Sequence, residues 1–357
     1  MSDLILNEPR VIREKMLLDQ VVLVDGQPGC GKTLFTAIIA AMERVELLNY
    51  SGELENLCAL KYLNKIKDDA VEAMVRIQMD LVLYETMMSR GTNFRPSDLS
   101  SAFRNVNVVT YLKRLFAKGD EVIPERIKRE KPILHFATHN LLAFCEPVFK
   151  ALGEKVVVIE IVRHPLYMLI QQTLNREHHM DPSGAARQFH LYIKYREHQL
   201  PFKNFGQEEL FLRSNPVERA IYEMQKTTEL TETFKNEYQN QFGSQILTIP
   251  FEPFVLDPWP YIKKVEKLLK SRITRKTRKV MKKQKVPRKK ISDGIPLAIY
   301  KRCGWEPPSS NLTEEEELDK RRRFAIDNGA NKNALSTLNL LVEDYENNHW
   351  SLNNNQV

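Results

Sequence analysis

Eight residues near the start of the chain, 26–33 with the sequence GQPGCGKT, restrict its fold more than any other feature. A short β-branched run, 21–25, precedes them and an apolar stretch, 33–45, follows, so they join a strand to a helix. Glycine-rich turns in this setting bind phosphate, because backbone N–H groups, a helix N-terminus and a lysine converge on one anion. The alternative is a turn that binds nothing. The residues that we expect to hold the phosphate are Gln27, Pro28, Gly29, Cys30, Gly31, Lys32 and Thr33.

Three further apolar runs, 132–137, 155–162 and 246–251, read as strands, and helix-like segments alternate with them. This alternation predicts an α/β fold of the P-loop nucleotide-binding type, with a mainly parallel sheet covered by helices. Polar clusters follow two of the runs, Thr-His-Asn at 138–140 and Arg-His-Pro at 163–165. Since ligands bind at the carboxyl ends of parallel strands, we expect these clusters to share one site with the phosphate loop.

The chain divides into two parts. Residues 1–290 contain the strands and the phosphate loop, and we expect them to form the nucleotide-binding core. Residues 291–357 read as a helical extension that packs on the core. Its first helix is marked by Thr313 and Glu316, which have the spacing of a capping box.

Charge is distributed unevenly along the chain. The net charge is +7, but residues 272–290 contain eleven Lys or Arg and no acid, so the remainder carries −4. Such a segment binds nucleic acid, another anionic surface or solvent, and it leaves a nucleic-acid partner open. We expect no membrane span, because no apolar run reaches the roughly 18 residues needed. The first residues lack an apolar signal core, so we expect a cytoplasmic protein.

The loop does not identify its nucleotide. Proteins that use ATP hold Mg²⁺ with an acid near the end of another apolar strand. Glu160 is a candidate, but it lies inside the run 155–162 and more apolar residues follow it. We therefore expect no metal site.

Four segments, taken in order, resemble the sulfotransferase superfamily that uses 3′-phosphoadenosine 5′-phosphosulfate (PAPS). Residues 26–35 resemble its 5′-phosphosulfate loop, and 137–139 resemble the strand end that carries the catalytic base in one branch. Residues 160–165 resemble the element whose arginine binds the 3′-phosphate, and 250–258 resemble a late strand–helix unit. The resemblance covers about residues 21–290.

The resemblance implies PAPS as the donor, without a metal, and a hydroxyl or amine acceptor whose identity stays open. It assigns His139 as the base and Lys32 as the charge on the departing phosphate. From position alone, a helix-capping or core role for His139 is an equal alternative. The resemblance also departs at the loop, because the family has Lys or Arg where Gly29 stands and Ser or Thr where Lys32 stands.

For the 3′-phosphate, the resemblance implies Arg163, for which a solvated turn arginine is the alternative. Gln171 stands where the family has a serine, and an amide can also donate to phosphate. A late basic loop closes over the donor in this family. The matching residues are Arg288, Lys289 and Lys290.

Three function classes remain open from the sequence. The first is a sulfotransferase. The second is an ATP-dependent kinase or ATPase, which the intact Gly-Lys-Thr of the loop favours. The third is a non-catalytic nucleotide- or nucleic-acid-binding protein, which the basic segment 272–290 favours.

Overall fold

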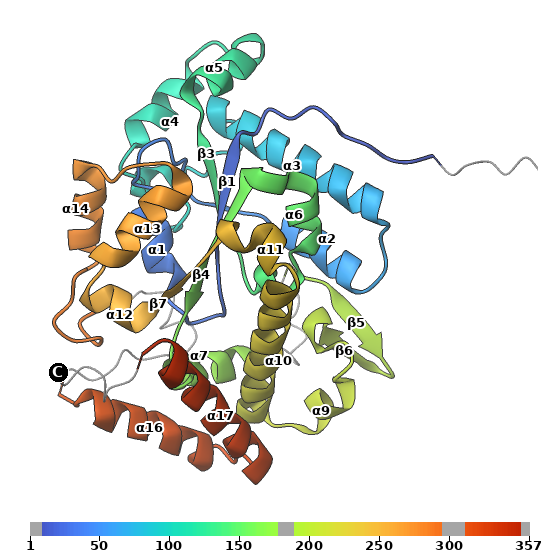
Figure 1. The fold of residues 1–357 in the computed structure, drawn as a ribbon, viewed down its shortest axis with the longest axis vertical. Coiled ribbons are helices and arrows are strands. Elements are labelled where there is room, and N and C mark those ends of the chain that lie inside the picture. The colour runs from blue at the N-terminus through green and yellow to red at the C-terminus, as the bar shows by residue number, and fades with distance from the viewer. Residues whose placement is uncertain (1–8, 178–188, 295–310, 351–357) are drawn as a thin grey trace, which may run out of the picture.

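The central sheet contains five parallel strands: β1 (Gln20–Asp25), β2 (Asn49–Tyr50), β3 (Ile133–Ala137), β4 (Val156–Val162) and β7 (Ile246–Pro250). Their order across the sheet is β2-β3-β1-β4-β7. The computed structural model describes residues 9–177, 189–294 and 311–350. Helices surround the sheet (Figure 1), so the α/β class predicted from the sequence is confirmed.

Side chains of β1 alternate between two hydrophobic cores. Val22 and Val24 point into one core, while Val21 and Leu23 point into the other. Successive side chains of a strand face opposite sides of the sheet, so a strand buried on both faces needs a continuous apolar run. This requirement explains the sequences of β1 and β4, which are almost entirely apolar.

The two faces of the sheet are covered by separate sets of helices, and each set contributes buried side chains to the core on its own face. One face is covered by α1 (Lys32–Ile39), α13 (Trp259–Leu269) and α14 (Arg275–Lys283). The other is covered by α2 (Gly52–Tyr62), α3 (Asp68–Met88), α5 (Ile123–Glu130) and α6 (Glu146–Leu152).

Strand register brings the polar clusters to one edge of the sheet. Val24 of β1 lies beside Ala137 of β3 and Ile159 of β4. The residues that follow β1, β3 and β4 therefore leave the sheet at similar heights. The helices gathered at this carboxyl edge in Figure 1 are α7 (Pro165–Glu177), α10 (Pro216–Glu237), α16 (Glu314–Asp327) and α17 (Lys332–Asn348).

The two C-terminal helices α16 and α17 pack on α7 and α10. The buried Arg321 guanidinium of α16 donates to the carbonyl oxygens of Leu166 and Tyr167 at 3.5 and 3.4 Å. The capping box of Thr313 and Glu316 is present at the start of α16. Residues 295–310 and 351–357 of the expected extension lie outside the described part of the chain.

Two local features differ from the sequence predictions. The first helix ends at Ile39 instead of continuing to residue 45, and Arg44 then adopts a left-handed φ of 62° that no helix continues through. Strands β5 (Tyr192–Tyr195) and β6 (His198–Pro201) form an antiparallel hairpin that was not predicted. Within the described residues, no helix combines the length and the apolar character needed to cross a bilayer.

Candidate functional site

The phosphate loop follows β1 and is shaped by glycines. Gly29 and Gly31 have φ values of 89° and 102°, in the region that favours glycine. A Cβ atom on Gly31 would lie 2.3 Å from the Phe251 ring, and one on Gly29 would lie 3.1 Å from Oε1 of Gln171. The backbone therefore needs glycine at both positions, as a loop that wraps a phosphate does.

Lys32 begins α1, and its side chain folds back over the loop. The buried ammonium group donates to the carbonyl oxygen of Gly26 and, at 3.2 Å, to that of Gln27. A phosphate held in the loop would give this ammonium a charged acceptor in place of neutral ones, which makes a stronger bond. The Cys30 side chain packs in the core, and burial raises the pKa of its thiol.

Amide side chains fix the outer half of the loop. Gln172 of α7 donates from Nε2 to Oε1 of Gln27 and to the carbonyl oxygen of Pro28, both at 3.2 Å. Gln27 in turn donates to Thr228 Oγ1 of α10 at 3.1 Å. The loop is thus held in place by two helices from the carboxyl edge of the sheet.

The larger cavity at this edge has a volume of about 660 Å³, which is the size of a small-molecule site. One wall consists of the phosphate loop with Lys32 and Thr33, and His139 lies in another. Charged groups also line it: Glu55, Arg176, Lys203 and Glu223. Its aromatic lining consists of Tyr50, Phe144, Phe189 and Phe202.

The turn after β3 is anchored to the end of β1. The buried carboxylate of Asp25 accepts hydrogen bonds from Thr138 Oγ1 at 2.8 Å and from the backbone N–H groups of Leu141 and Leu142 at 3.0 and 2.8 Å. These bonds engage both carboxylate oxygens of Asp25 and fix the backbone around His139. Asp25 is therefore a structural acid of this turn.

His139 is half-exposed and paired with a carboxylate from α2. Its Nδ1 lies 3.1 Å from Oε1 of Glu55, and its backbone N–H donates to the same oxygen at 2.8 Å. Burial acts to raise the pKa of Glu55, but the hydrogen bond and charge of His139 outweigh it and lower that pKa. Lys203 donates to the carbonyl oxygen of His139 at 3.3 Å, and burial lowers its pKa.

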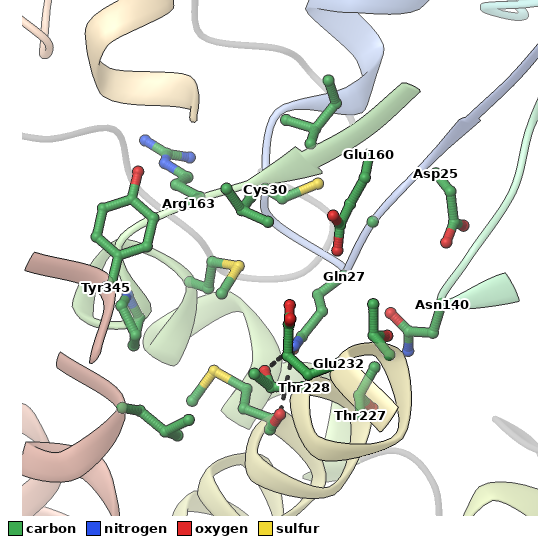
Figure 2. Close-up of a pocket in the computed structure, with 18 of the residues that line it drawn as sticks. Asp25, Gln27, Cys30, Asn140, Glu160, Arg163, Thr227, Thr228, Glu232 and Tyr345 are labelled. Carbon is green, nitrogen blue, oxygen red and sulfur yellow. Dashed lines mark hydrogen bonds between the residues drawn. The ribbon is translucent and has the colours of Figure 1, made fainter. Parts of the chain in front are cut away.

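Arg163 lies on the other side of the loop, against a smaller cavity of about 80 Å³ that Figure 2 shows. Its Nη1 donates to the carbonyl oxygen of Gly29 at 2.9 Å, and its Nε lies 3.4 Å from Oε1 of Glu252. Glu252 is completely buried and also accepts from the Tyr345 hydroxyl at 2.5 Å. Arg163 is therefore not in the larger cavity with His139, although both adjoin the loop.

Glu160 also faces the smaller cavity (Figure 2), and its carboxylate already has partners. Lys235 of α10 donates to its Oε2 at 3.1 Å and Thr248 of β7 donates to the same atom at 2.6 Å. In residues 9–177, 189–294 and 311–350, no group of three or more His, Cys, Asp and Glu side chains is placed to hold a metal ion. Glu160 therefore acts as the carboxylate of a structural ion pair.

Arg288 meets Arg163 at the Phe251 ring, at the start of α12 (Phe251–Leu256). The two guanidinium carbons lie 5.5 and 4.4 Å from the ring centroid. Burial and the positive charge of Arg163 lower the pKa of Arg288 to about 10. Lys289 and Lys290 are exposed to solvent next to it.

Solved sulfotransferase domains have a similar fold. The sulfotransferase domain of the Synechococcus PCC 7002 olefin synthase is 12% identical, with 95% of this chain and 98% of that chain covered and a TM-score of 0.41. The sulfotransferase domain from the curacin biosynthetic pathway is 11% identical, with 87% and 98% covered and a TM-score of 0.41. A sulfotransferase from Mycobacterium tuberculosis H37Rv is 11% identical, with 85% and 76% covered and a TM-score of 0.36.

These likenesses are too distant to transfer residues or substrates. No protein-family profile matches the chain. No curated protein matches it either. The chemistry of the site therefore rests on its own geometry.

Four residues at the site had no signal that sequence reasoning used. Glu55 lies 84 residues before its partner His139, and Lys203 lies 64 residues after it, so only the fold brings them together. Gln172 is next to the predicted Gln171 but points to Gln27 and Pro28. Glu252 lies within the segment 250–258, where the motif marked a strand–helix unit and gave no role to the acid.

Proposed function

We propose that the chain transfers a sulfuryl group from PAPS to a hydroxyl or amine acceptor held in the larger cavity. The observation that carries the proposal is that Lys32 of the phosphate loop and the Glu55–His139 pair line the same cavity. A group that can bind a phosphate and a group that can accept a proton therefore line the same cavity. The volume of about 660 Å³ suits an acceptor lying beside the reactive end of the donor.

The Glu55–His139 pair supports a base with a defined tautomer. An ionised carboxylate only accepts hydrogen bonds, and the lowered pKa of Glu55 favours its ionised form. His139 Nδ1 therefore carries the hydrogen, and the lone pair of the neutral ring lies on Nε2. This is the arrangement in which a carboxylate orients a histidine base.

In the proposed reaction, His139 Nε2 accepts the proton of the acceptor. The acceptor oxygen or nitrogen bonds to sulfur while the bond between sulfur and the 5′-phosphate oxygen breaks, and the electron pair stays on that oxygen. Lys32 and the loop N–H groups stabilise the resulting charge. In the larger cavity, the aromatic side chains would exclude water from the acceptor.

For the 3′-phosphate we propose the guanidinium groups of Arg163 and Arg288 as the main ligands. We propose Gln171, which lies beside Gly29, and Lys289 and Lys290, which follow Arg288 in the chain, as further donors. Two guanidinium groups that meet at one aromatic ring repel each other, and an anion between them would relieve this repulsion. Arg163 already donates to the carbonyl oxygen of Gly29, so a 3′-phosphate bound to Arg163 would lie next to the phosphate loop.

Thermal unfolding with two nucleotides tests the donor. We expect 3′,5′-ADP to raise the melting temperature without Mg²⁺, and to do so more than ATP with Mg²⁺ does. A ligand at a hundred times its Kd stabilises the folded state by about 2.7 kcal/mol. The Lys32→Ala variant, which should lose most of this shift, is the control for binding at the loop.

A P-loop kinase or ATPase is the second candidate. The loop sequence keeps Gly-Lys-Thr, and Thr33 lies in the same cavity as the carboxylates of Glu55 and Glu223. Against it, β3 on one side of β1 ends at Ala137 and is followed by Thr138 and His139, without an acid. On the other side, Glu160 of β4 is already bonded to Lys235 and Thr248. A thermal shift seen only with ATP and Mg²⁺ would favour this candidate and reject PAPS as donor.

A further inference from the structure

Helix α4 (Val108–Leu115) has its polar and apolar faces reversed. Its buried side chains are Tyr111 and Arg114, whose polar groups bond to the Glu46 carboxylate at distances of 2.7 to 2.9 Å. A surface helix normally buries its apolar side chains and exposes its charged ones. The inward face of α4 is therefore held by an ion pair, and its outward face is left to the apolar residues.

The outward face of α4 forms an apolar stripe. Val109 and Leu112 are exposed on successive turns, and Phe116, just after the helix, is 89% exposed. Leu115 and Phe103, the latter 51% exposed, extend the same region. Single exposed apolar side chains are ordinary, but five within fourteen residues indicate a surface that another phase or molecule covers.

The neighbouring helices α13 and α14 form a basic face. Between residues 259 and 290, fourteen Lys or Arg side chains are exposed and Glu266 is the single acid. In the part of the chain that the structure describes, none of the fourteen forms an ion pair with a carboxylate. Eleven of the fourteen are lysines.

A hydrogen bond joins the apolar stripe to the basic face. Lys276 Nζ, in the first turn of α14, donates to Asn107 Oδ1 at the N-terminus of α4 at 2.6 Å. Figure 1 shows α4 and α14 on the same flank of the molecule. Residues 101–118 contain no Asp or Glu, while Arg104, Lys113 and Lys118 are exposed among the apolar side chains.

We propose that this flank docks on the surface of an anionic lipid bilayer. The apolar stripe would enter the boundary between headgroups and acyl chains, and the basic face would lie over the lipid phosphates. Trp259, which is 40% exposed with the Arg278 guanidinium 5.7 Å from its ring, adds an aromatic side chain of the kind that membrane interfaces favour.

The charge pattern favours a bilayer over the other occupants. A second copy docked face to face would bring the two basic faces together, and their like charges would repel each other. A nucleic acid would match the basic face but would leave the apolar stripe in water. Lysine-rich surfaces next to exposed apolar side chains gain from both the lipid charge and the acyl boundary.

Vesicle flotation tests the proposal, independently of any sulfuryl transfer. Vesicles of phosphatidylcholine with about 30% phosphatidylserine should carry the full chain to the top of the gradient at 0.1 M NaCl. Pure phosphatidylcholine vesicles should not, and about 0.5 M NaCl should weaken binding because it screens the charges. The paired variants L112S/F116S and K279E/K283E should each weaken binding about tenfold or more.

Matched substitutions on the C-terminal helices separate a docking surface from a general loss of charge or apolar area. I326S/L340S replaces two exposed apolar side chains, and K320E/K332E reverses two exposed lysines; both should bind vesicles like the wild type. All four variants should keep the wild-type melting temperature and the response to 3′,5′-ADP, because every altered side chain is exposed.

Three results would overturn the proposal. Equal binding to neutral and anionic vesicles would remove the role of the basic face. Dimers in solution that L112S/F116S dissociates would assign the stripe to a second copy. Binding to a DNA or RNA duplex that K279E/K283E abolishes and L112S/F116S leaves intact, with no flotation, would assign the flank to nucleic acid.

Discussion

The two sides of the phosphate loop differ in how far their polar groups are already satisfied. On the side of the smaller cavity, Arg163 is bonded to Gly29 and Glu252, and Glu160 is bonded to Lys235 and Thr248. On the side of the larger cavity, His139 has one ring nitrogen engaged by Glu55 and lines about 660 Å³ of open space. The polar clusters after β3 and β4 look equivalent in sequence, yet only the first opens onto a space large enough for an acceptor.

A polar cluster at a strand end can therefore have one of two roles. Satisfied groups such as Glu160 hold the loop in shape, while groups with remaining hydrogen-bonding capacity in an open cavity are available for chemistry. Arg163 lies between these cases, because its guanidinium still has donors beyond those that Gly29 and Glu252 use. Substitutions on the two sides should therefore affect different steps.

The largest effect is expected for His139→Ala. Removing a general base costs about a hundredfold or more in turnover, and donor affinity should stay nearly unchanged. Release of 3′,5′-ADP from PAPS, measured with a panel of hydroxyl and amine acceptors, gives the rate. His198→Ala removes an exposed histidine of β6 and serves as the control. Equal rates in both variants would show that His139 has no catalytic role.

The next effect is expected for Lys32→Ala. Its ammonium should contribute about 1.5–3 kcal/mol to donor binding as a charged hydrogen bond, about ten- to a hundredfold in Kd. Calorimetric titration with 3′,5′-ADP measures the loss, and Lys320→Ala on the exposed face of α16 is the matched control. Unchanged affinity would identify the loop as a structural turn.

A smaller and selective effect is expected for Arg163→Ala. If its guanidinium binds the 3′-phosphate, the Kd for 3′,5′-ADP should rise about tenfold while that for 5′-AMP stays the same. Arg323→Ala, on the exposed side of α16, controls for the loss of charge. An equal loss for both nucleotides would instead mean that Arg163 acts by supporting the loop at Gly29.

The smallest effect concerns the pH dependence of the Glu55–His139 pair. The pKa of Glu55 in the folded protein lies below 4.5, the ordinary value of a glutamate side chain. The charge of Glu55 therefore stabilises the fold at pH values above about 4.5, and this stabilisation is lost as the pH falls through the native pKa. The difference in melting temperature between wild type and Glu55→Gln should be largest near neutral pH and should shrink in acid. A difference that grows in acid would contradict the assigned pair.

Much of the fold was predictable because its signals are local. The strand runs, the phosphate loop and the capping box of α16 each lie within a few residues, and the structure contains all of them. The end of α1 was missed because the chain leaves the helix after Ile39 and turns over residues 40–44, and the apolar stretch 33–45 gives no signal for this change.

The site was predictable only in part because its partners come from distant segments. Sequence placed Lys32 and His139 at strand ends, and parallel strands bring such residues together. No local pattern pairs His139 with Glu55, or Arg163 with Glu252, because those contacts depend on how α2 and α12 pack on the sheet. The basic segment 272–290 was equally visible, but its neighbour, the reversed helix α4, needed the fold to show which face is buried.

The hydrogen bond between Tyr345 and Glu252 means that α17, the last described helix, supports the phosphate loop. Tyr345 of α17 holds the buried carboxylate that in turn lies against Arg163 and, through it, Gly29. Amide protons of α17 should therefore exchange more slowly when a nucleotide fills the loop, even though this helix is far along the chain from residues 26–33. Chains truncated before Tyr345 should not show this slower exchange in the residues of α17 that remain. In the full chain, amide exchange in α17 would report nucleotide binding.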